Sequence, residues 1–344
     1  MISFDKSTEN TLKEDGDHIY YNVNIKNTPK NKGLAVFDDN RVEPIITNPN
    51  LYDIAVVRFS VPSQNIPIFI WRGDEDPLFI SLEYKDITYS TQLEWFDNSP
   101  SDRLEWYGQA VWNYNDFVNS INIAFKNCYD NLKITEPTAP FTFSPKMTFN
   151  PHTELCSIYV EPSYSSEITT TSGIKIYFNE GLSNFFPAFQ NYGNDDFSVS
   201  SIIKKDQILF IPNITNLPTI NGISYIVAEE EYSTLFLWND FKTLLFETDC
   251  PVITESQGAQ KNDIRRVLTD FEPLEQINDR SSIQYFPQGL PRFYDLVSSY
   301  PLSRISIRVF WETKGGKIFP IRLNKSDILT VKLYFKRKGY MIDY

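Results

Sequence analysis

The sequence predicts an all-β protein, a jelly-roll β-sandwich with insertions and one main α-helix near residues 115–130. Two observations carry this prediction. Aromatic residues make up 15% of the 344 residues, and large planar side chains favour pleated sheets. Short stretches of alternating apolar and polar residues recur along the chain with long connections between them, which is typical of β-sandwiches. The length allows one elaborated domain or two.

The chain begins with a polar and charged segment. Residues 1–17 are expected to form a flexible N-terminal arm, because they contain too few apolar side chains to pack. Alternate positions are apolar in residues 18–26, which predicts the first strand. Residues 27–33 carry turn-forming side chains and are expected to be a loop.

Residues 48–70 contain the clearest strand. The odd-numbered positions from Ala55 to Val61 are apolar, and Pro62 ends the run. One face of this strand is therefore expected to meet a core, and the other to be half polar. The apolar piece at residues 66–70 contains a second proline, which predicts an edge strand or a corner.

A hairpin and a helix follow. Residues 78–84 and 87–95 alternate on either side of a two-residue turn, which predicts a β-hairpin. In residues 115–130 the apolar positions recur every three to four residues instead. This spacing predicts an α-helix, with Asn113 or Asn115 as its cap.

Residues 137–145 are spaced by prolines and form the candidate domain boundary. The jelly-roll core is therefore expected to comprise residues 18–136 and 223–344, with residues 137–222 as an insertion or second β lobe. A short helix is expected at residues 182–186. Further strands are expected near residues 147–149, 155–161, 174–178, 207–211, 223–228, 232–238 and 242–247.

The C-terminal part predicts a meander of three antiparallel strands. Apolar residues alternate in residues 305–311, in residues 319–323 and again in residues 329–335. A Lys-Gly-Gly-Lys turn separates the first two runs. No internal repeat of fixed period occurs in the sequence.

The charge balance argues against binding to nucleic acid. The formal net charge is −12, from 32 Lys and Arg against 44 Asp and Glu, and no block of five basic residues occurs. Lys332, Lys336, Arg337 and Lys338 come nearest to a basic patch. Lysines on edge strands more often block unwanted pairing than contact DNA or a membrane, so edge protection is the favoured interpretation.

The cysteines and the apolar runs indicate in which cellular compartment the protein is expected. Cys128, Cys156 and Cys250 are far apart and form no CxxC pair, so neither a zinc ribbon nor a disulfide framework is expected. A reducing compartment fits this usage. No signal peptide and no membrane span are predicted, because no apolar run approaches eighteen residues.

Groups for catalysis are scarce. His18 and His152 are the only histidines, and neither lies in a catalytic motif, so surface positions are the favoured interpretation. Carboxylates cluster at residues 74–76, 195–196 and 229–231. Solvated loop charge explains them better than a calcium loop, or than a glycosidase pair, which would have to face across a cleft. No enzyme activity, metal site or cofactor is predicted.

Arg72, Gly73 and Asp74 form an RGD tripeptide. In an exposed turn, a guanidinium and a carboxylate displayed together can bind an integrin receptor. Matches to three letters are common by chance, so a plain turn between two strands is the favoured interpretation.

Several segments, taken in order, carry a family resemblance. They include RVEPIITNPNLYDIAVVRFSVPSQNIPIFI, YKDITYSTQLEWF, IKIYFNEGLSNFFPAF, YSTLFLWNDFKTLLFETDCPVITES and the region from SSIQYFPQGLPRFYDLV to VKLYFKRKG. Together they resemble the penton, or minor capsid, proteins of the Polinton (Maverick) and virophage lineage of tailless double-stranded DNA viruses. The resemblance covers most of residues 19–339. It departs at Trp71, where the family commonly has proline, and residues 188–222 match nothing in it.

The resemblance implies a structural, non-enzymatic role. The expected unit is a homopentamer at each fivefold vertex of an icosahedral capsid, wedged among trimeric double jelly-roll major capsid proteins. It implies location in the virion, with assembly in the host cytoplasm or a viral factory. Arg58, Arg304 and Arg308 lie among apolar neighbours, so they are candidate subunit-contact or buried-pair residues.

Two other functions remain open from the residues alone. A carbohydrate-binding or host-attachment β-sandwich would use exposed aromatic side chains as a sugar platform, although such clusters at strand ends more often belong to a core. A β-sandwich glycoside hydrolase is the third alternative. The candidate platform residues are Trp95, Trp106, Tyr107, Trp112 and Tyr114.

Overall fold

The computed structural model divides the chain into two compact units. Unit 1 comprises Met1–Ile66 and Phe241–Tyr344, and unit 2 comprises Pro67–Asp240. Unit 2 is therefore inserted in sequence between two parts of unit 1. The structure describes residues 16–71, 76–95, 107, 109–164, 173–193, 207–210, 219–220, 222–252, 265–272, 282–286 and 289–339.

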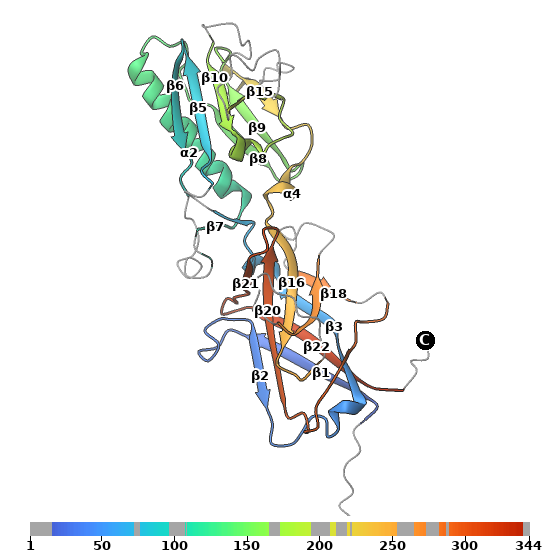
Figure 1. The fold of residues 1–344 in the computed structure, drawn as a ribbon. Coiled ribbons are helices and arrows are strands. Elements are labelled where there is room, and N and C mark those ends of the chain that lie inside the picture. The colour runs from blue at the N-terminus through green and yellow to red at the C-terminus, as the bar shows by residue number, and fades with distance from the viewer. Residues whose placement is uncertain are drawn as a thin grey trace, which may run out of the picture. The chain divides into compact units, whose positions relative to one another are not determined.

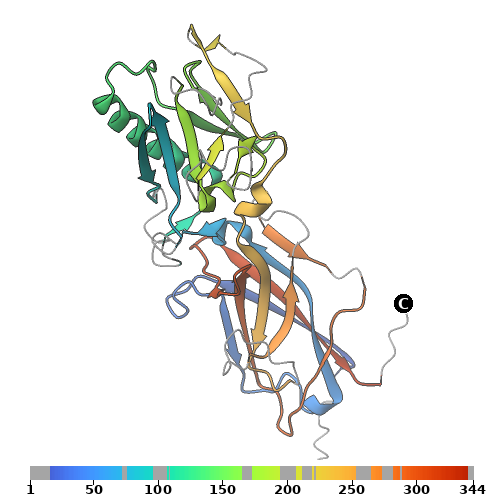
Figure 2. The same ribbon diagram turned by 45° about the horizontal axis from the view of Figure 1, so that its top comes forward.

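Unit 1 is a sandwich of two antiparallel sheets (Figure 1, Figure 2). The first sheet has the order β1-β22-β3-β18, with β19 paired to β3; the second has the order β17-β16-β20-β2, with β21 paired to β20. The chain passes between the two sheets in the order of a jelly roll. The strands are β1 (His18–Lys26), β2 (Val36–Asn40), β3 (Tyr52–Pro62), β16 (Phe241–Thr248), β17 (Val267–Phe271), β18 (Ser282–Tyr285), β19 (Tyr294–Asp295), β20 (Arg304–Thr313), β21 (Ile318–Pro320) and β22 (Ile328–Arg337).

Alternating apolar residues build the core of unit 1. On β1, Val23 and Ile25 are buried while their sequence neighbours are exposed, as the pattern of residues 18–26 predicts. The aromatic ring of Phe59 packs on the ring of Phe246 in the other sheet, with centroids 4.5 Å apart. The two sheets are thus joined by side chains that sequence periodicity assigns to the inner faces.

The predicted C-terminal meander is confirmed for two strands and wrong for the third. β20 and β21 pair as a hairpin. β22 instead leaves that sheet and pairs with β1 on one side and β3 on the other. Alternation shows which residues of a strand face the core, but it carries no information about the partner strand.

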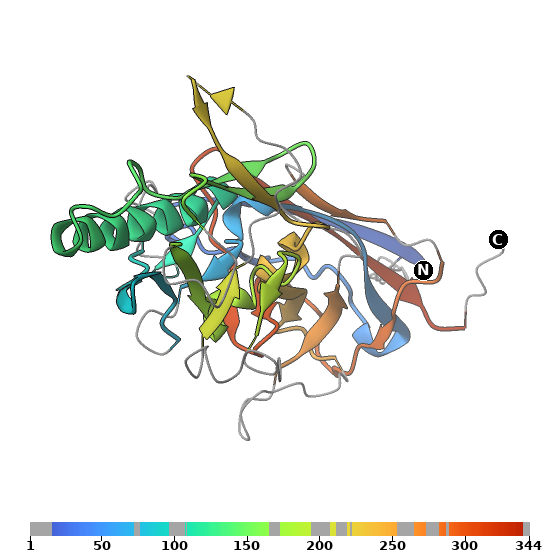
Figure 3. The ribbon, with the colours of Figure 1, turned by 90° about the horizontal axis from the view of Figure 1, so that it is seen from above.

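Unit 2 packs one long helix against short strands. The predicted helix is confirmed as α2 (Tyr114–Thr135), and the Asn113 side chain accepts a hydrogen bond from the Asp116 backbone amide at 2.9 Å. The predicted hairpin is also confirmed, and its turn places Lys85 and Asp86 at positive φ of 50° and 64°. In the ribbon views α2 runs alongside the sheet that contains this hairpin (Figure 1, Figure 3).

The sheets of unit 2 have the orders β11-β12-β10-β5-β6, β15-β9-β8, β13-β14 and β4-β7. Residues 232–238, predicted as a strand, form instead a turn and the short helix α4 (Leu235–Trp238). A short apolar run does not distinguish a strand from one helical turn. The remaining elements are β4 (Phe69–Ile70), β5 (Phe79–Tyr84), β6 (Ile87–Gln92), β7 (Ala110–Val111), β8 (Lys146–Asn150), β9 (Leu155–Val160), β10 (Lys175–Asn179), α3 (Glu180–Ser183), β11 (Asn191–Tyr192), β12 (Gln207–Phe210), β13 (Thr219–Ile220), β14 (Ile223–Ser224) and β15 (Ile226–Glu229), with the 3-10 turns η1 (Pro49–Leu51) and η2 (Ser63–Asn65) in unit 1.

The observed division differs from the expected insertion at residues 137–222. The proline-spaced connector lies inside unit 2, because Ala139 and Phe141 are buried in the core of that unit. Part of the unmatched segment, residues 188–222, also belongs there, since β11 and β12 extend the sheet of β10. The unit boundaries lie instead at Ile66 and Phe241.

Candidate functional site

Catalytic groups are not gathered in the described part of the chain. His18 lies on β1 in unit 1, with its Nδ1 atom 2.6 Å from the Tyr334 hydroxyl, whereas His152 lies in an exposed turn of unit 2. No group of three or more His, Cys, Asp or Glu side chains within the described ranges is arranged to hold a metal ion. Among the helices of those ranges, none is long and apolar enough to cross a membrane.

One predicted loop carboxylate is a buried structural group. Glu230 is 3% exposed. It accepts hydrogen bonds from the Cys156 backbone amide at 2.7 Å and from the Thr234 hydroxyl at 2.6 Å. Burial raises the pKa of Glu230, while these two donors act in the opposite direction. The expectation of solvated charge at residues 229–231 is therefore wrong at this position, because the side chain joins β9 to the chain that precedes α4.

The outer side of the sheet β17-β16-β20-β2 carries charges of both signs in ion pairs; we call it the ion-paired face. Arg304 binds Asp38 through two hydrogen bonds of 2.8 and 3.1 Å. Arg308 binds Asp249 at 2.7 Å. Both arginines thus have carboxylate partners within their own subunit. The remaining pairs on this face are Arg265–Glu247, Lys242–Glu312 and Arg292–Asp270.

On the outer side of the sheet β1-β22-β3-β18, three cations form no ion pair of 4 Å or less with a carboxylate of the described residues. We call the surface formed by Arg58, Lys332 and Lys336 the cationic face. Lys332 lies directly opposite Arg58 in the strand register. No carboxylate of the described residues lies within ion-pair distance of any of the three. The Lys332 ammonium instead lies 4.2 Å above the ring of Tyr20, which stacks on Tyr334.

A β-bulge directs Arg58 outward. Leu333 pairs with Val56 and Lys332 pairs with Arg58, so Val57 is an extra residue on β3. Ile54 and Val56 face the core before the bulge, and Phe59 and Val61 face it afterwards. The single alternation predicted from Ala55 to Val61 is therefore wrong, since the bulge changes its phase and Val57 and Arg58 are less buried than their neighbours.

Lys332 and Lys336 do not protect a sheet edge. They lie on β22, which is hydrogen-bonded to β1 on one side and to β3 on the other. The interpretation of these lysines as edge-blocking residues is therefore wrong. Arg337 and Lys338, by contrast, are paired, Arg337 with Asp17 at 3.3 Å and Lys338 with Asp295 at 3.4 Å.

Two carboxyl groups adjoin this surface. Burial of Asp53, and then its contact with the Asp295 carboxyl, raises the pKa of Asp53 to about 6. The hydrogen bond from Asp53, with the charge of Lys338, lowers the pKa of Asp295. In mildly acidic solution Asp53 is therefore protonated while Asp295 stays ionised.

Substituting Asp53→Asn is expected to stabilise unit 1 at pH 7.5. The folded pKa of about 6 exceeds the unfolded value of about 3.9, so the stability from protonated Asp53 is present below about pH 4 and lost as pH rises through 6. We expect a gain of about 1 kcal/mol at pH 7.5, discounted because solvent screens the pair. Urea unfolding of wild type and Asp53→Asn at pH 5 and pH 7.5 measures the gain in the free energy of unfolding, with Asp270→Asn as the control. If the free energy of unfolding changed with pH in Asp53→Asn as it does in wild type, the raised pKa of Asp53 would be contradicted.

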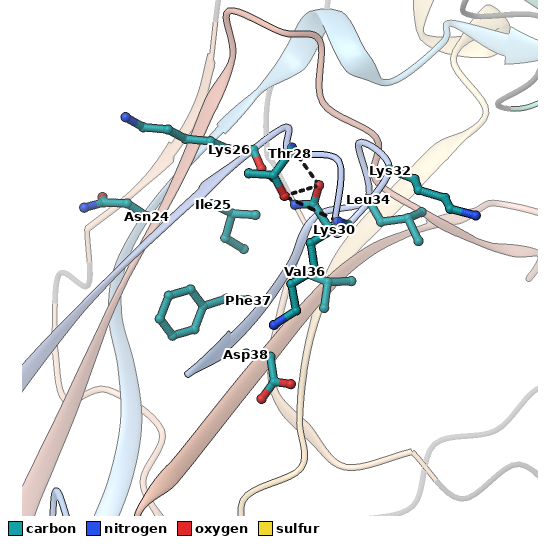
Figure 4. A pocket seen from close by; sticks show the side chains of 11 residues that line it. Asn24, Ile25, Lys26, Thr28, Lys30, Lys32, Leu34, Val36, Phe37 and Asp38 are labelled. Carbon is teal, nitrogen blue, oxygen red and sulfur yellow. Dashed lines mark hydrogen bonds between the residues drawn. The ribbon is translucent and has the colours of Figure 1, made fainter. Parts of the chain in front are cut away.

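An open pocket of about 530 Å³ lies between β1 and β2 (Figure 4). Ile25, Val36 and Phe37 form its apolar floor, while Lys26 and Lys32 lie on its rim. These strands are the ends of their respective sheets, so the pocket opens at one edge of the sandwich. Asp38 is the one carboxylate among the described residues that line the pocket, and it is bound to Arg304. An apolar edge of this kind is suited to packing against protein.

The aromatic side chains of the sugar-platform alternative pack inside unit 2. Trp95 is partly buried and donates a hydrogen bond to the Ala110 carbonyl at 3.3 Å. Tyr107 is buried and lies beside Trp112, and Tyr114 packs on Phe149 and Trp238. Trp106 and the RGD residues Arg72, Gly73 and Asp74 lie outside the described residues.

Sequence reasoning missed the surroundings of the cationic face. Tyr20 and Lys332 are more than 300 positions apart in the chain, and only the pairing of β1 with β22 brings them together. A usable signal was present: both lie at the polar positions of their strands, on the face opposite the core. The strand partner was the missing information.

A family model and two virophage proteins are similar in sequence to this chain. The family model described as Sputnik minor capsid protein V18/19 matches residues 19–337. Structural protein V19 of Sputnik virophage is 28% identical over 204 residues, which cover 56% of this chain and 93% of V19. Uncharacterized protein V18 of the same virophage is 32% identical over 157 residues, which cover 38% of this chain and 93% of V18.

Two solved structures are similar over nearly the whole chain. A chain in the cryo-EM structure of the Sputnik virophage has a TM-score of 0.75 and 25% identity, covering 94% of this chain and 99% of that one. The crystal structure of the mavirus penton protein has a TM-score of 0.69 and 17% identity, covering 93% and 99%. The all-β jelly-roll prediction is confirmed by the sheet order and by these likenesses.

Proposed function

Because the chain belongs to the Sputnik minor capsid protein V18/19 family, we propose that five copies form the capsomer at each fivefold vertex of an icosahedral capsid. It is a structural protein of the virion, as its Sputnik relatives are. The observation that carries the pentamer proposal is the jelly roll of unit 1, in a chain whose fold matches the mavirus penton protein.

A closed ring needs two different surfaces that fit each other on opposite sides of the subunit. The sandwich of unit 1 has such surfaces at its two edges. One edge is formed by β1 and β2 and contains the apolar pocket, while the other is formed by β17 and β18. Edge strands offer unpaired backbone groups as well as side chains. We place the contacts between neighbours in the ring at these edges.

The arginines predicted as contact residues have different roles in this proposal. Arg304 and Arg308 hold carboxylates of their own subunit, so they shape the ion-paired face. Arg58 has no partner of this kind among the described residues and is the one that contacts another chain. The neighbours of the pentamer are double jelly-roll major capsid proteins, and assembly takes place in the host cytoplasm or a viral factory.

The two units differ in net charge, which supports different surroundings for them in the virion. Unit 2 contains 23 Asp and Glu against nine Lys and Arg, whereas unit 1 contains 21 against 23. A nearly neutral jelly roll suits contacts within a shell, and a strongly acidic unit suits exposure to solvent. We therefore propose that unit 2 is exposed to solvent on the virion. The RGD tripeptide belongs to its sequence, and a host receptor is a possible ligand.

The chain is proposed to have no catalytic activity. Its two histidines lie in different units, and two buried loop carboxylates of the described residues, Glu230 and Asp327, accept hydrogen bonds from donors of their own fold. A glycoside hydrolase needs two carboxyl groups facing across a cleft. The pocket between β1 and β2 provides one carboxylate, and that one is held by Arg304.

The purified chain is expected to sediment as a pentamer, either alone or when mixed with its major capsid protein. Edge contacts between neutral jelly rolls are largely apolar, so the pentamer should persist at raised salt. Analytical ultracentrifugation measures the mass directly. A strictly monomeric species in both settings would contradict the proposal. Glycan-array binding by that monomer would favour the carbohydrate-binding alternative.

A further inference from the structure

The cationic face places like charges next to each other. Arg58 and Lys332 are cross-strand neighbours on β3 and β22, and Lys336 follows on the same side of β22. Like charges directly opposite each other in a sheet destabilise it. Neither strand is a sheet edge, so protection against edge pairing does not account for this arrangement. An arrangement that costs stability in the free subunit indicates a use in a complex.

Aromatic side chains cover the area beside these cations. Tyr20 is 56% exposed and stacks on Tyr334 with ring centroids 4.8 Å apart. Phe293 packs edge-on against Tyr334, and the Lys336 ammonium lies 5.4 Å from the centre of the Phe293 ring. Tyrosine and arginine are enriched where proteins bind each other. The face combines an aromatic area with the positive charge of Arg58 and Lys332, while Lys336 lies opposite Asp53 in the strand register.

We propose that the cationic face docks an acidic surface of the major capsid protein that adjoins each pentamer. This inference rests on the proposed function and adds the surface used. Arg58 and Lys332 pair with carboxylates of the partner, which removes their mutual repulsion, and Tyr20 supplies apolar contact area. Complementary charge across such a contact selects the partner and speeds association.

A second copy of the chain fits this face less well. If the ring contacts were made by the sheet faces and not by the edges, the cationic face would meet the ion-paired face of its neighbour, where Asp38 and Asp249 are already bound to Arg304 and Arg308. Breaking those pairs would offset what the new contacts contribute. The apolar pocket at the β1 and β2 edge is better suited to contacts within the ring.

Duplex nucleic acid also fits less well. Three cations would neutralise about three phosphates, whereas proteins that bind DNA firmly contact about six to ten. A flat sheet does not enter a groove, and a net charge of −12 repels a polyanion. These two alternatives are distinguishable by experiment.

The test measures binding of the full-length chain to major capsid protein purified from the same particle, by biolayer interferometry at 50 and 300 mM salt. The double variant Arg58→Glu, Lys332→Glu is expected to lose at least tenfold in affinity, and wild type to weaken with salt. The control Lys317→Glu, Lys325→Glu changes the net charge equally, at two exposed turn positions of unit 1, and is expected to stay within twofold. Arg58→Ala, Lys332→Ala should lose affinity too, and it tests the same contact without new negative charge.

Each outcome decides between the alternatives. Equal binding by wild type and by the two double variants of Arg58 and Lys332 would overturn the inference without contradicting the proposed pentamer. Loss of the pentamer in Arg58→Glu, Lys332→Glu, with unchanged thermal unfolding, would assign the face to ring contacts and overturn it as well. The inference would also be overturned if wild type bound a duplex DNA oligonucleotide at 150 mM salt and Arg58→Glu, Lys332→Glu did not. A wild-type chain that is monomeric in every setting contradicts the proposed function itself.

Discussion

Replacing Phe117 with alanine is expected to lower the stability of unit 2 by about 3–5 kcal/mol, since the truncation leaves a cavity in a closely packed core. Phe117 is 1% exposed and lies on α2 at the centre of an aromatic cluster. Its ring centroid lies 5.0 Å from that of Trp238 and 5.1 Å from those of Phe69 and Phe185. Alanine would remove all of these contacts together.

Differential scanning calorimetry measures this effect. The transition of unit 2 is expected to fall by about 10 °C, while the transition of unit 1 stays in place because its core contains none of these residues. Ile123→Ala is the matched control on the same helix, where the side chain is 39% exposed, and its effect should stay within about 0.5 kcal/mol. Equal shifts of both transitions in Phe117→Ala would show that the two cores unfold as one.

Replacing Asp327 with alanine is expected to cost unit 1 about 3 kcal/mol, because buried donors would lose a charged acceptor. The Asp327 carboxylate, 7% exposed, accepts hydrogen bonds from Asn65 at 2.8 Å, from Gln64 at 3.0 Å and from the Asn324 backbone amide at 2.9 Å. Asn65 is fully buried. The network joins η2, the turn after β3, to the loop before β22.

Urea unfolding of unit 1 checks the Asp327 prediction. Asp327→Asn keeps one acceptor oxygen and should lose about 1 kcal/mol, less than alanine. Asp270→Ala removes an exposed carboxylate paired with Arg292 and should change stability by less than about 0.5 kcal/mol. If Asp327→Ala were as mild as Asp270→Ala, the network would have no structural role.

Local sequence signals predicted local structure well. The alternation of residues 18–26 gave β1 with its observed bounds, and the asparagine cap and apolar spacing gave α2. These succeeded because the information lies within one turn of helix or one strand. The family resemblance, based on the order of several segments, is confirmed over residues 19–337.

Contacts between distant parts of the chain could not be predicted from the sequence. The partner of β22 depends on contacts with β1, whose residues lie more than 300 positions away. The bulge at Val57 depends on the register between β3 and β22, which no single strand encodes. The prolines of residues 137–145 suggested a linker, yet Phe141 anchors that segment in the core of unit 2. In each case the deciding contact comes from a distant part of the chain.

The cationic face could likewise be predicted only in part from the sequence. Arg58 was identified because a charged residue interrupts an apolar strand. Its neighbour Lys332 was attributed to an edge strand, since the sequence does not show that β22 lies inside a sheet. Arg304 and Arg308 were identified by the same reasoning as Arg58, and only the structure shows that carboxylates of their own subunit hold them.

We propose that this jelly roll forms the fivefold capsomer of a virion, and a cryo-EM reconstruction of the particle that contains this chain would test it. We expect five copies around each fivefold axis, with density that fits the sheets β1-β22-β3-β18 and β17-β16-β20-β2 of unit 1. Vertex density that fits another protein, with this chain found elsewhere in the particle or outside the shell, would contradict it.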